Sequence, residues 1–256
     1  MSRTPTIVPG LDRVEIPEVR QAIPVLHAYL RARVLDGTLA PGTKLSQVAL
    51  ASQLGVSRTP LREVLRMMQE EGLVCIEPNQ RTRVAGLDPR ELDEVYASRI
   101  LTETLAMSLS MDGFTGADEQ QAAALLAEMH DVSATGDVQQ WFEAHARFHQ
   151  LITSGAGPHL RRQLTALADR SIRYIRIYQM SEPGSWQSPG DAEHIEILKA
   201  LTRNDRCEAL SRLAHHLART AGGVLAECAP DFVMKAVPHA LAIVEGSTSQ
   251  ARTQER

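Results

Sequence analysis

The sequence has few aromatic residues, few cysteines and no long apolar run. Aromatic residues make up only 4% of its 256 residues, and its three cysteines, Cys75, Cys207 and Cys228, are widely separated. Three scattered thiols do not suggest a disulfide framework, and no segment approaches the roughly 20 apolar residues of a transmembrane helix. The first residues, MSRTPTIVPG, lack the apolar core of a signal peptide. We therefore expect a reduced, globular, cytoplasmic protein with no membrane partner.

Charge is unevenly distributed along the chain. Residues 1–87 contain 11 Lys and Arg against 8 Asp and Glu, whereas residues 88–256 contain 16 against 23. A basic N-terminal part can bind a polyanion, which the acidic remainder would repel. Asp88 and Pro89 are typical of a helix start, because Asp caps helices and Pro fits their first position. We predict a flexible arm (1–18), a first domain (19–87), a second domain (88–230) and a partly disordered C-terminal extension (231–256).

Apolar residues recur with a helical period over most of the second domain. This pattern predicts an antiparallel bundle of six helices, at 89–112, 116–134, 137–154, 158–181, 190–203 and 205–227. Strand signals occur only in LVCIE (73–77) and RTRVAG (81–86), which predict a short β-hairpin. The polar tail from Gly246 is expected to be mobile. The fold class is therefore mainly α with one small β-ribbon.

Residues 45–73 predict two helices joined by a tight turn. The first ends at Leu-Gly-Val (54–56), and Ser57 or Thr59 can cap the second. Pro60 falls in the first turn of the second helix, where its missing N–H costs least. The apolar residues of this helix follow the i, i+3, i+4, i+7 rule and predict a buried face, namely Leu61, Val64, Leu65 and Met68. The arrangement is that of a helix-turn-helix.

Three arginines, Arg58, Arg62 and Arg66, step by four along another face of this second helix. At this spacing guanidinium groups can reach successive phosphates and guanine edges in a major groove. The hairpin that follows, with Arg81 and Arg83, would form a wing beside the helix. The alternative is an ordinary helix pair with a solvated charged face, since acidic residues lie on the same helix. The turn, the proline and the hairpin together favour binding of double-stranded DNA.

Residues from about 20 to 86 resemble the winged helix of the GntR superfamily of bacterial transcription regulators. The motifs that carry the resemblance are LAPGTKL (39–45), LGVSRTPLREVLRMMQEEGL (54–73) and RTRVAG (81–86). Gln80-Arg81 stands where the wing of the family usually has Arg-Gly, so a glycine that allows close approach to DNA is absent. The DNA contacts that the resemblance implies are Arg58, Thr59 and Arg62 in the helix, with Asn79, Gln80 and Arg81 in the wing.

Histidines lie on or beside the apolar faces of three predicted helices. His145 and His149 are one helical turn apart within 137–154, so their rings can converge on one ion. His194 is in register with the apolar residues of 190–203, and His216 flanks the apolar face of 205–227, whereas His215 points farther outward. The alternative is a set of core histidines bonded to their neighbours. A shared divalent ion would be Zn²⁺ or Ni²⁺, because nitrogen ligands favour borderline metals.

The same region is similar to the FCD ligand-binding domain of the FadR subgroup, a helical bundle with an Asp-x3-His pair and two later histidines around a metal. The resemblance lies in ARFHQLI (146–152), His194 and HHL (215–217). It implies His149, His194 and His216 as ligands, and six helices over 89–227 fit the shorter type of this domain. His145 replaces the usual carboxylate, which changes the charge and hardness of the site.

Arg99 and Glu103 lie among apolar residues of the first helix of the second domain. Arg99 either pairs with Glu103 one turn away or binds a ligand carboxylate whose other oxygens reach the metal. Members of the family typically sense small organic acids or sugar acids, so the resemblance implies an effector of this kind.

Three functions are compatible with these features. The first is a homodimeric transcription regulator, expected to be a repressor, that dimerises through the helical domain. We expect the dimer to bind an inverted repeat, because one winged helix contacts too few base pairs to select a single site in a genome. The second is a metal-dependent hydrolase with a nucleic-acid-binding head. No HExxH, GxSxG or phosphate loop occurs in the sequence, and four protein ligands leave little room for an activated water. The third, a constitutive architectural DNA binder, would not need the histidine-bearing bundle.

Overall fold

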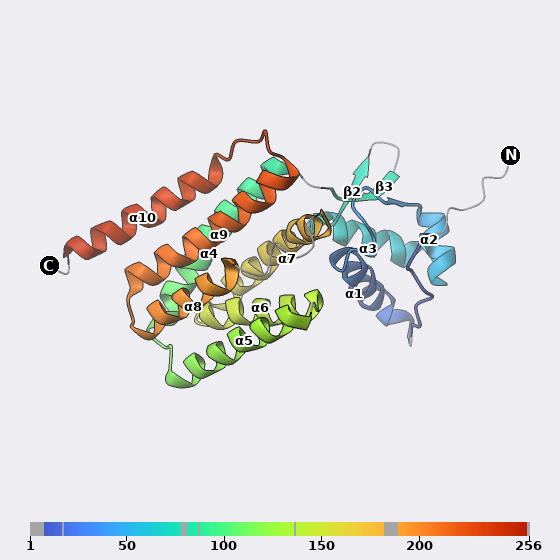
Figure 1. Cartoon of the computed structure of the whole chain (residues 1–256). Coiled ribbons are helices and arrows are strands. Elements are labelled where there is room, and N and C mark those ends of the chain that lie inside the picture. Colours follow the sequence, from blue (N-terminus) through green and yellow to red (C-terminus); the bar gives the residue numbers. More distant parts are fainter. Residues whose placement is uncertain are drawn as a thin grey trace. The chain divides into compact units, whose positions relative to one another are not determined.

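The computed structural model divides the chain into two compact units (Figure 1). It describes residues 8–16, 18–77, 81–86, 88–135, 137–181 and 189–254. Unit 1 comprises Met1–Leu87 together with Ile172–Ile177, and unit 2 comprises Asp88–Ser171 together with Tyr178–Arg256. Each unit is described by itself.

Unit 1 combines short helices with a small antiparallel sheet. Its elements are η1 (Val19–Gln21), α1 (Ala22–Leu35), β1 (Lys44–Leu45), α2 (Gln47–Leu54), α3 (Arg58–Glu70), β2 (Val74–Glu77) and β3 (Arg81–Val84). Strands β2 and β3 form the expected hairpin, in which Val74 pairs with Val84. The sheet has a third strand, because β1 pairs with β3 and completes the order β1-β3-β2. A strand of two residues carries no periodic signal, so the sequence did not indicate β1.

Helices α2 and α3 form the predicted helix-turn-helix. Gly55 ends α2 in the left-handed region, with a φ of 72°, which a glycine adopts without strain. Ser57 is the residue that caps α3, although its side chain makes no capping hydrogen bond. The predicted apolar face of α3 is confirmed, since Leu61, Val64, Leu65 and Met68 are all fully buried. The helix is thereby fixed to the core on one side and leaves its other side exposed.

The segment before α1 is packed on unit 1, so the expectation of a flexible arm over 1–18 is wrong for residues 8–16. Val8 and Leu11 are buried. The Gln53 side chain accepts a hydrogen bond from the Val8 N–H and donates to the carbonyl oxygens of Val8 and Leu11, at 2.7–2.9 Å. The N–H of Val14 donates to Leu54 O. A single amide side chain thus satisfies backbone groups that a strand partner would otherwise satisfy.

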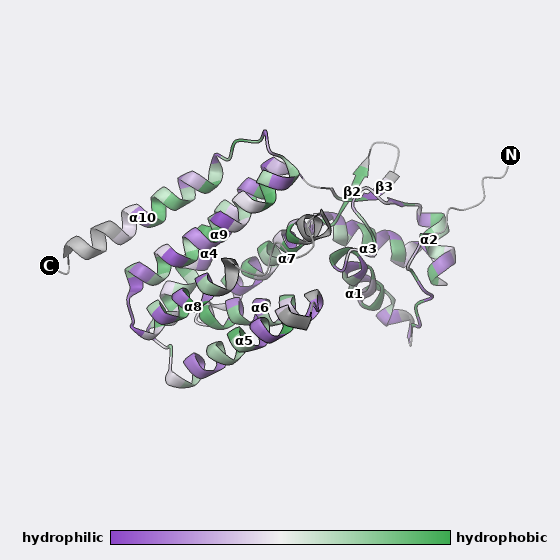
Figure 2. Ribbon diagram, in the orientation of Figure 1, coloured by the Kyte–Doolittle hydropathy of each residue, from purple (hydrophilic) through white to green (hydrophobic). Residues whose placement is uncertain are grey.

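Unit 2 is a bundle of helices. The six predicted ones are α4 (Pro89–Met111), α5 (Gly116–Thr135), α6 (Val138–Ile152), α7 (Pro158–Ser181), α8 (Pro189–Thr202) and α9 (Arg206–Cys228). Asp88 caps α4 by accepting the N–H groups of Arg90 and Glu91. Helix α5 packs on α6, while α9 packs on α4 and α8. The hydropathy colouring of Figure 2 shows apolar and polar residues interspersed along the helices of this bundle.

A further helix, α10 (Ala236–Gln254), occupies the segment expected to be partly disordered, and it packs on α4 and α9 (Figure 1). Its buried residues are Val237, Ala240 and Val244. The buried carboxylate of Asp93 on α4 accepts the N–H groups of Lys235, Ala236 and Val237 at 2.8–2.9 Å. The prediction failed because this cap comes from about 140 residues earlier in the chain, whereas local polarity suggested a tail. None of the described helices is long and apolar enough to cross a membrane.

Candidate DNA-binding surface and histidine centre

The exposed side of α3 carries the residues predicted to contact DNA. Arg58, Thr59 and Arg62 are exposed, and neither arginine forms an ion pair within the described part of the chain. Arg66, one turn further, contacts the carboxylates of Glu63 and Glu70. Hydrogen bonding to Arg66 and its positive charge lower the pKa of Glu63. Arg66 is therefore neutralised within its own helix, and Arg58 and Arg62 keep their charge available for an anion.

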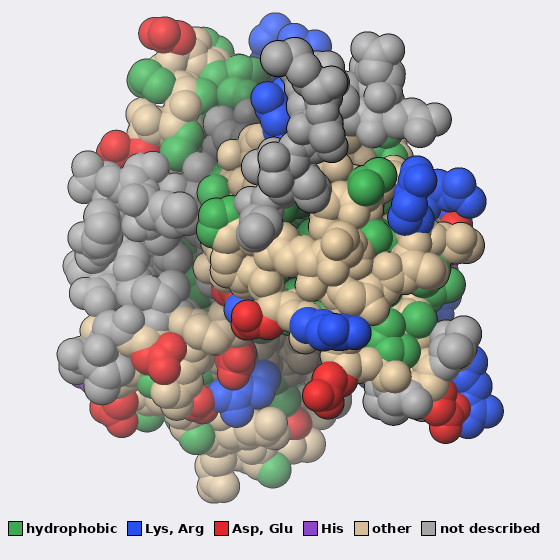
Figure 3. Space-filling model, turned by 90° about the vertical axis from the view of Figure 1, so that its right-hand side faces the viewer, with side chains coloured by type: hydrophobic (Ala, Val, Ile, Leu, Met, Phe, Trp, Pro, Cys, Tyr) green, Lys and Arg blue, Asp and Glu red, His purple; other side chains and the backbone are tan. Residues whose placement is uncertain are grey.

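The hairpin follows α3 directly, as a wing would. Asn79 and Gln80 lie outside the described residues, and Arg81 is the first residue of β3. Figure 3, which shows the face at the right of Figure 1, has Lys and Arg side chains at several separate places. The indication of DNA binding therefore comes from the winged-helix fold of unit 1 and the exposed arginines of α3, and it does not come from a continuous basic patch on this face.

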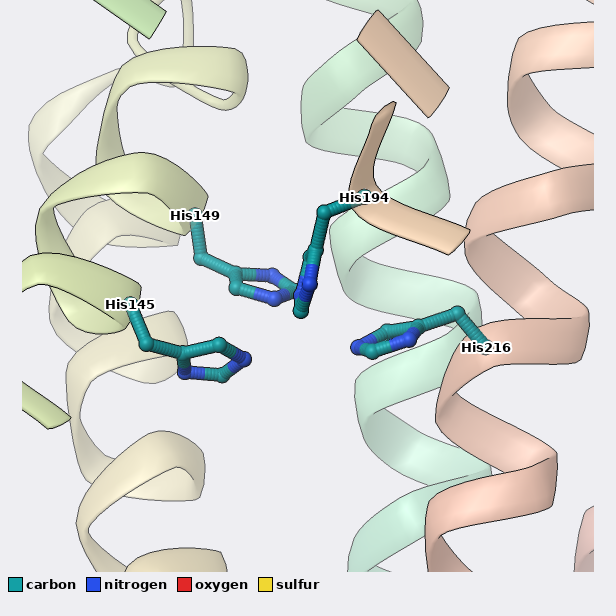
Figure 4. A group of neighbouring side chains, drawn as sticks. All are labelled: His145, His149, His194 and His216. Carbon is teal, nitrogen blue, oxygen red and sulfur yellow. The ribbon is translucent and has the colours of Figure 1, made fainter. Parts of the chain in front are cut away.

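Four histidines from three helices of unit 2 point toward one another (Figure 4). Helix α6 supplies His145 and His149, α8 supplies His194, and α9 supplies His216. One ligating nitrogen of each lies within 4.8 Å of those of the other three. His149, His194 and His216 are buried, whereas His145 is partly exposed and stacks on the indole of Trp141. His215 is exposed and its Nε2 lies 3.3 Å from Glu245 on α10, so it takes no part in the cluster.

The state of these imidazoles suits metal binding. Burial, followed by the charges of the neighbouring histidines, lowers the pKa of His145 well below its ordinary value. Burial also lowers the pKa of His216 to about 4, despite the opposing hydrogen bond with Glu193. Both rings are therefore neutral at pH 7, and a neutral imidazole has a free lone pair.

The geometry also suits a divalent ion. Nε2 of His149 is buried and has no hydrogen-bond partner among the described residues. Nitrogens of a tetrahedral zinc site are separated by roughly 3.4 Å, so small side-chain rotations would bring this set into range. The cluster can therefore hold a divalent metal ion.

Two carboxylates lie behind the cluster. Glu103 Oε2 is 3.0 Å from Nδ1 of His149, and Glu193 Oε2 is 2.8 Å from Nδ1 of His216. Burial raises the pKa of Glu103, but the charge of Arg99 and the hydrogen bond with His149 outweigh it, so the pKa falls to about 2. Arg99 Nε contacts Glu103 at 2.6 Å, which is the intrahelical pair weighed from the sequence. Arg99 also donates from Nη1 to Ser171 Oγ on α7.

Sequence reasoning did not find the roles of Glu193 and Ser171. Glu193 directly precedes His194, so on α8 it points about 100° away from that ring and toward α9. The only sequence signal for Glu193 was its position next to a core-facing histidine, and this position does not indicate which histidine Glu193 contacts. Ser171 lies 72 residues from Arg99, and no local pattern connects them.

A separate groove of about 420 Å³ lies along α5 and α6. Its lining includes Glu128 and Arg147, which form an ion pair at 2.6 Å, and it includes none of the four histidines. The groove is therefore distinct from the histidine cluster.

Unit 1 and the histidine-bearing bundle define a DNA-binding protein with a separate helical domain, and comparison with known proteins agrees. The model described as "Bacterial regulatory proteins, gntR family" matches residues 25–84, and the FCD domain model matches residues 94–219. The chain belongs to the gntR family of bacterial regulatory proteins, in the group that carries an FCD domain. The matched families and relatives are transcriptional regulators, not enzymes, so the hydrolase alternative is not supported.

Curated relatives and solved structures agree with this assignment. The chain is 30% identical to the HTH-type transcriptional regulator McbR of Escherichia coli K12, over 69% of this chain and 80% of McbR. It is 27% identical to the transcriptional repressor GlaR of the same strain, over 75% of this chain and 90% of GlaR. The solved structure of E. coli McbR/YncC has a TM-score of 0.68 at 23% identity, covering 79% of this chain and 96% of that one. A putative regulator from Rhodococcus sp. RHA1 reaches 0.69 at 22% identity, over 82% and 99%. These two structures support the fold.

Proposed function

We propose that this transcriptional regulator is a repressor whose operator affinity is controlled by a small carboxylate metabolite bound at a zinc or nickel site in the helical domain. The observation that carries the proposal is the cluster of His145, His149, His194 and His216, because four imidazoles that converge inside a bundle have no evident role in DNA binding. An ion held by neutral ligands keeps its full positive charge and therefore attracts an anionic effector. Arg99 is the proposed second contact for the effector carboxylate, which would have to compete with the Glu103 carboxylate that Arg99 contacts at 2.6 Å.

The proposed DNA contacts are those on the exposed side of α3 and in the wing. Arg58 and Arg62 would bind phosphates or guanine edges, and Thr59, near the N-terminus of α3, would donate a hydrogen bond to the sugar-phosphate backbone of the DNA. Asn79, Gln80 and Arg81 would approach the minor groove. The exposure of the α3 residues supports the first part of this assignment.

The proposed assembly is a homodimer, formed through the helical domain, that binds an inverted repeat. Three leucines at four-residue spacing on α4, Leu101, Leu105 and Leu109, have relative exposures of 38%, 53% and 54%. A row of exposed leucines on one helix is typical of a protein contact. We expect sedimentation to show a dimer at micromolar concentration and Leu105→Glu to shift it toward the monomer. A monomeric parent that protects one asymmetric half-site would refute the assembly.

The metal part of the proposal is tested by elemental analysis and operator binding. Protein purified without chelators should carry close to one divalent ion per chain. His149→Ala should lose the ion and the response to added carboxylates, yet still bind DNA, because the two units have separate cores. His215→Ala is the matched control, since that ring is exposed. A metal-free parent, or equal metal loss in both variants, would contradict the proposal.

The regulatory part is tested by titrating candidate organic and sugar acids into an operator complex obtained by selection from genomic DNA. We expect at least one acid to weaken operator binding about tenfold in the metal-loaded protein and to have no effect after chelation. Operator binding that no acid changes in the metal-loaded protein would contradict control by a carboxylate.

A further inference from the structure

The outer nitrogens of two cluster histidines are both held by carboxylates. Nδ1 of His149 on α6 lies 3.0 Å from Glu103 of α4, and Nδ1 of His216 on α9 lies 2.8 Å from Glu193 of α8. Each contact therefore joins two different helices. An ionised carboxylate only accepts hydrogen bonds, so Nδ1 must carry the proton in both rings. When such a ring coordinates an ion, the lone pair that it offers is the one on Nε2.

Both carboxylates are fixed by arginines. Glu103 uses its second oxygen to accept from Arg99 Nε at 2.6 Å, and Arg99 is itself held by Ser171 at 2.9 Å. Glu193 accepts from Arg219 with both of its oxygens. The carboxylates consequently have no freedom to turn toward the cluster centre and act as ligands. Their remaining hydrogen bonds are directed to the histidine rings.

We propose that Glu103 and Glu193 are positioning residues, which fix the Nδ1–H tautomer of His149 and His216 and present both Nε2 atoms to a divalent ion. The inference rests on the proposed metal site. It is supported by the buried Nε2 of His149, which finds no partner among the described residues although Nδ1 is bonded. Carboxylates behind ligating histidines orient the ring and raise its basicity, and their loss commonly costs 10–100-fold in metal affinity.

The two carboxylates differ in exposure, which provides two independent tests. Glu103 and Arg99 are almost fully buried, so Glu103→Gln leaves an uncompensated buried cation and also lowers stability. Glu193 and Arg219 are partly exposed, with side-chain exposures of 31% and 42%, so Glu193→Gln should fold as the parent does. The control is Glu128→Gln, which removes an equally close Arg–Glu pair on the outer side of the bundle.

Zinc affinity is measured by competition with a chromophoric chelator, using the full-length protein. We expect a dissociation constant 10–100-fold higher for Glu103→Gln and for Glu193→Gln, and unchanged for Glu128→Gln. Nitrogen-15 chemical shifts of the metal-free protein report the tautomers directly. The parent should show Nδ1–H for His149 and His216, and each variant should show a mixture for its own histidine, because an amide can donate as well as accept.

The outcomes separate this inference from the proposed function. A parent that binds no zinc would refute the metal site itself. A parent that binds zinc, with Glu193→Gln and Glu103→Gln binding it within twofold of the parent, would overturn only the positioning role. Detection of the Nε2–H tautomer in the metal-free parent would overturn it as well.

Discussion

Replacing Asp93 by alanine should detach the start of α10 from the bundle. The carboxylate accepts three backbone N–H groups, those of Lys235, Ala236 and Val237. Loss of a capping carboxylate costs about 1 kcal/mol. The N–H groups of Lys235 and Ala236 are only part-buried and can bind water instead, but the bond to Val237 is buried. An orphaned buried donor costs about 1–3 kcal/mol. We therefore expect a loss of about 2–4 kcal/mol in the free energy of unfolding.

Urea unfolding measures the loss, and hydrogen exchange locates it. Exchange should accelerate in α10 before it does in α5 and α6, which do not depend on this cap. Asp137→Ala is the control, because Asp137 is exposed and caps α6 through a single N–H, that of Gln140. The reasoning would be refuted if both substitutions cost the same within about 0.5 kcal/mol, or if α10 exchanged no faster in the Asp93 variant.

Three further predictions concern DNA binding, acid stability and packing. Fluorescence anisotropy should show weaker operator binding for Arg58→Ala and for Arg62→Ala. A lost guanine contact should cost about 1–3 kcal/mol of binding free energy, and a lost phosphate contact should lower the slope of log affinity against log salt concentration by about one. Arg66→Ala should change operator affinity far less, because Arg66 is paired with acidic residues of its own helix. In the metal-free protein the pKa of His216 is about 4, below the value near 6.5 of a histidine in the unfolded chain. The contribution of His216 to the free energy of unfolding is therefore fully present above pH 6.5, and up to about 3 kcal/mol of it is lost as the pH falls to 4. Urea midpoints measured from pH 7.5 to 4.5 should show this decrease, and an equal decrease in His216→Gln would exclude it. Gly155→Ala should destabilise unit 2 by about 1–3 kcal/mol in thermal unfolding, because a Cβ there would lie 2.7–3.0 Å from backbone atoms of α4, and a neutral result would contradict the tight contact.

The elements that the sequence predicted correctly are those whose signal is local. The buried face of α3 repeats every three or four residues, and the hairpin strands flank a short turn, so the winged helix could be predicted from neighbouring residues alone. The capping of α4 by Asp88 is likewise local. The ring positions of His145, His149 and His194 followed from their register with apolar residues on each helix.

The features that the sequence did not predict depend on distant partners. Residues 8–16 are held by Gln53, and α10 by Asp93, over separations of about 45 and 140 residues. The second partners of the cluster histidines, Glu103 and Glu193, come from other helices, so their roles required the packing of the bundle. The metal, the effector and the individual DNA contacts stay predictions.

The stacking of Trp141 on His145 makes the histidine cluster optically accessible. The two rings lie 4.8 Å apart between centroids and are tilted by only 16°, so the indole senses the electronic state of the imidazole. Because a cation on the imidazole changes the electric field at the stacked indole, we expect binding of an ion at the cluster to change the indole emission. The sequence contains only one other tryptophan, Trp186. A Trp186→Phe variant would therefore give a single-fluorophore protein whose emission reports loading of the cluster in real time, without any attached label.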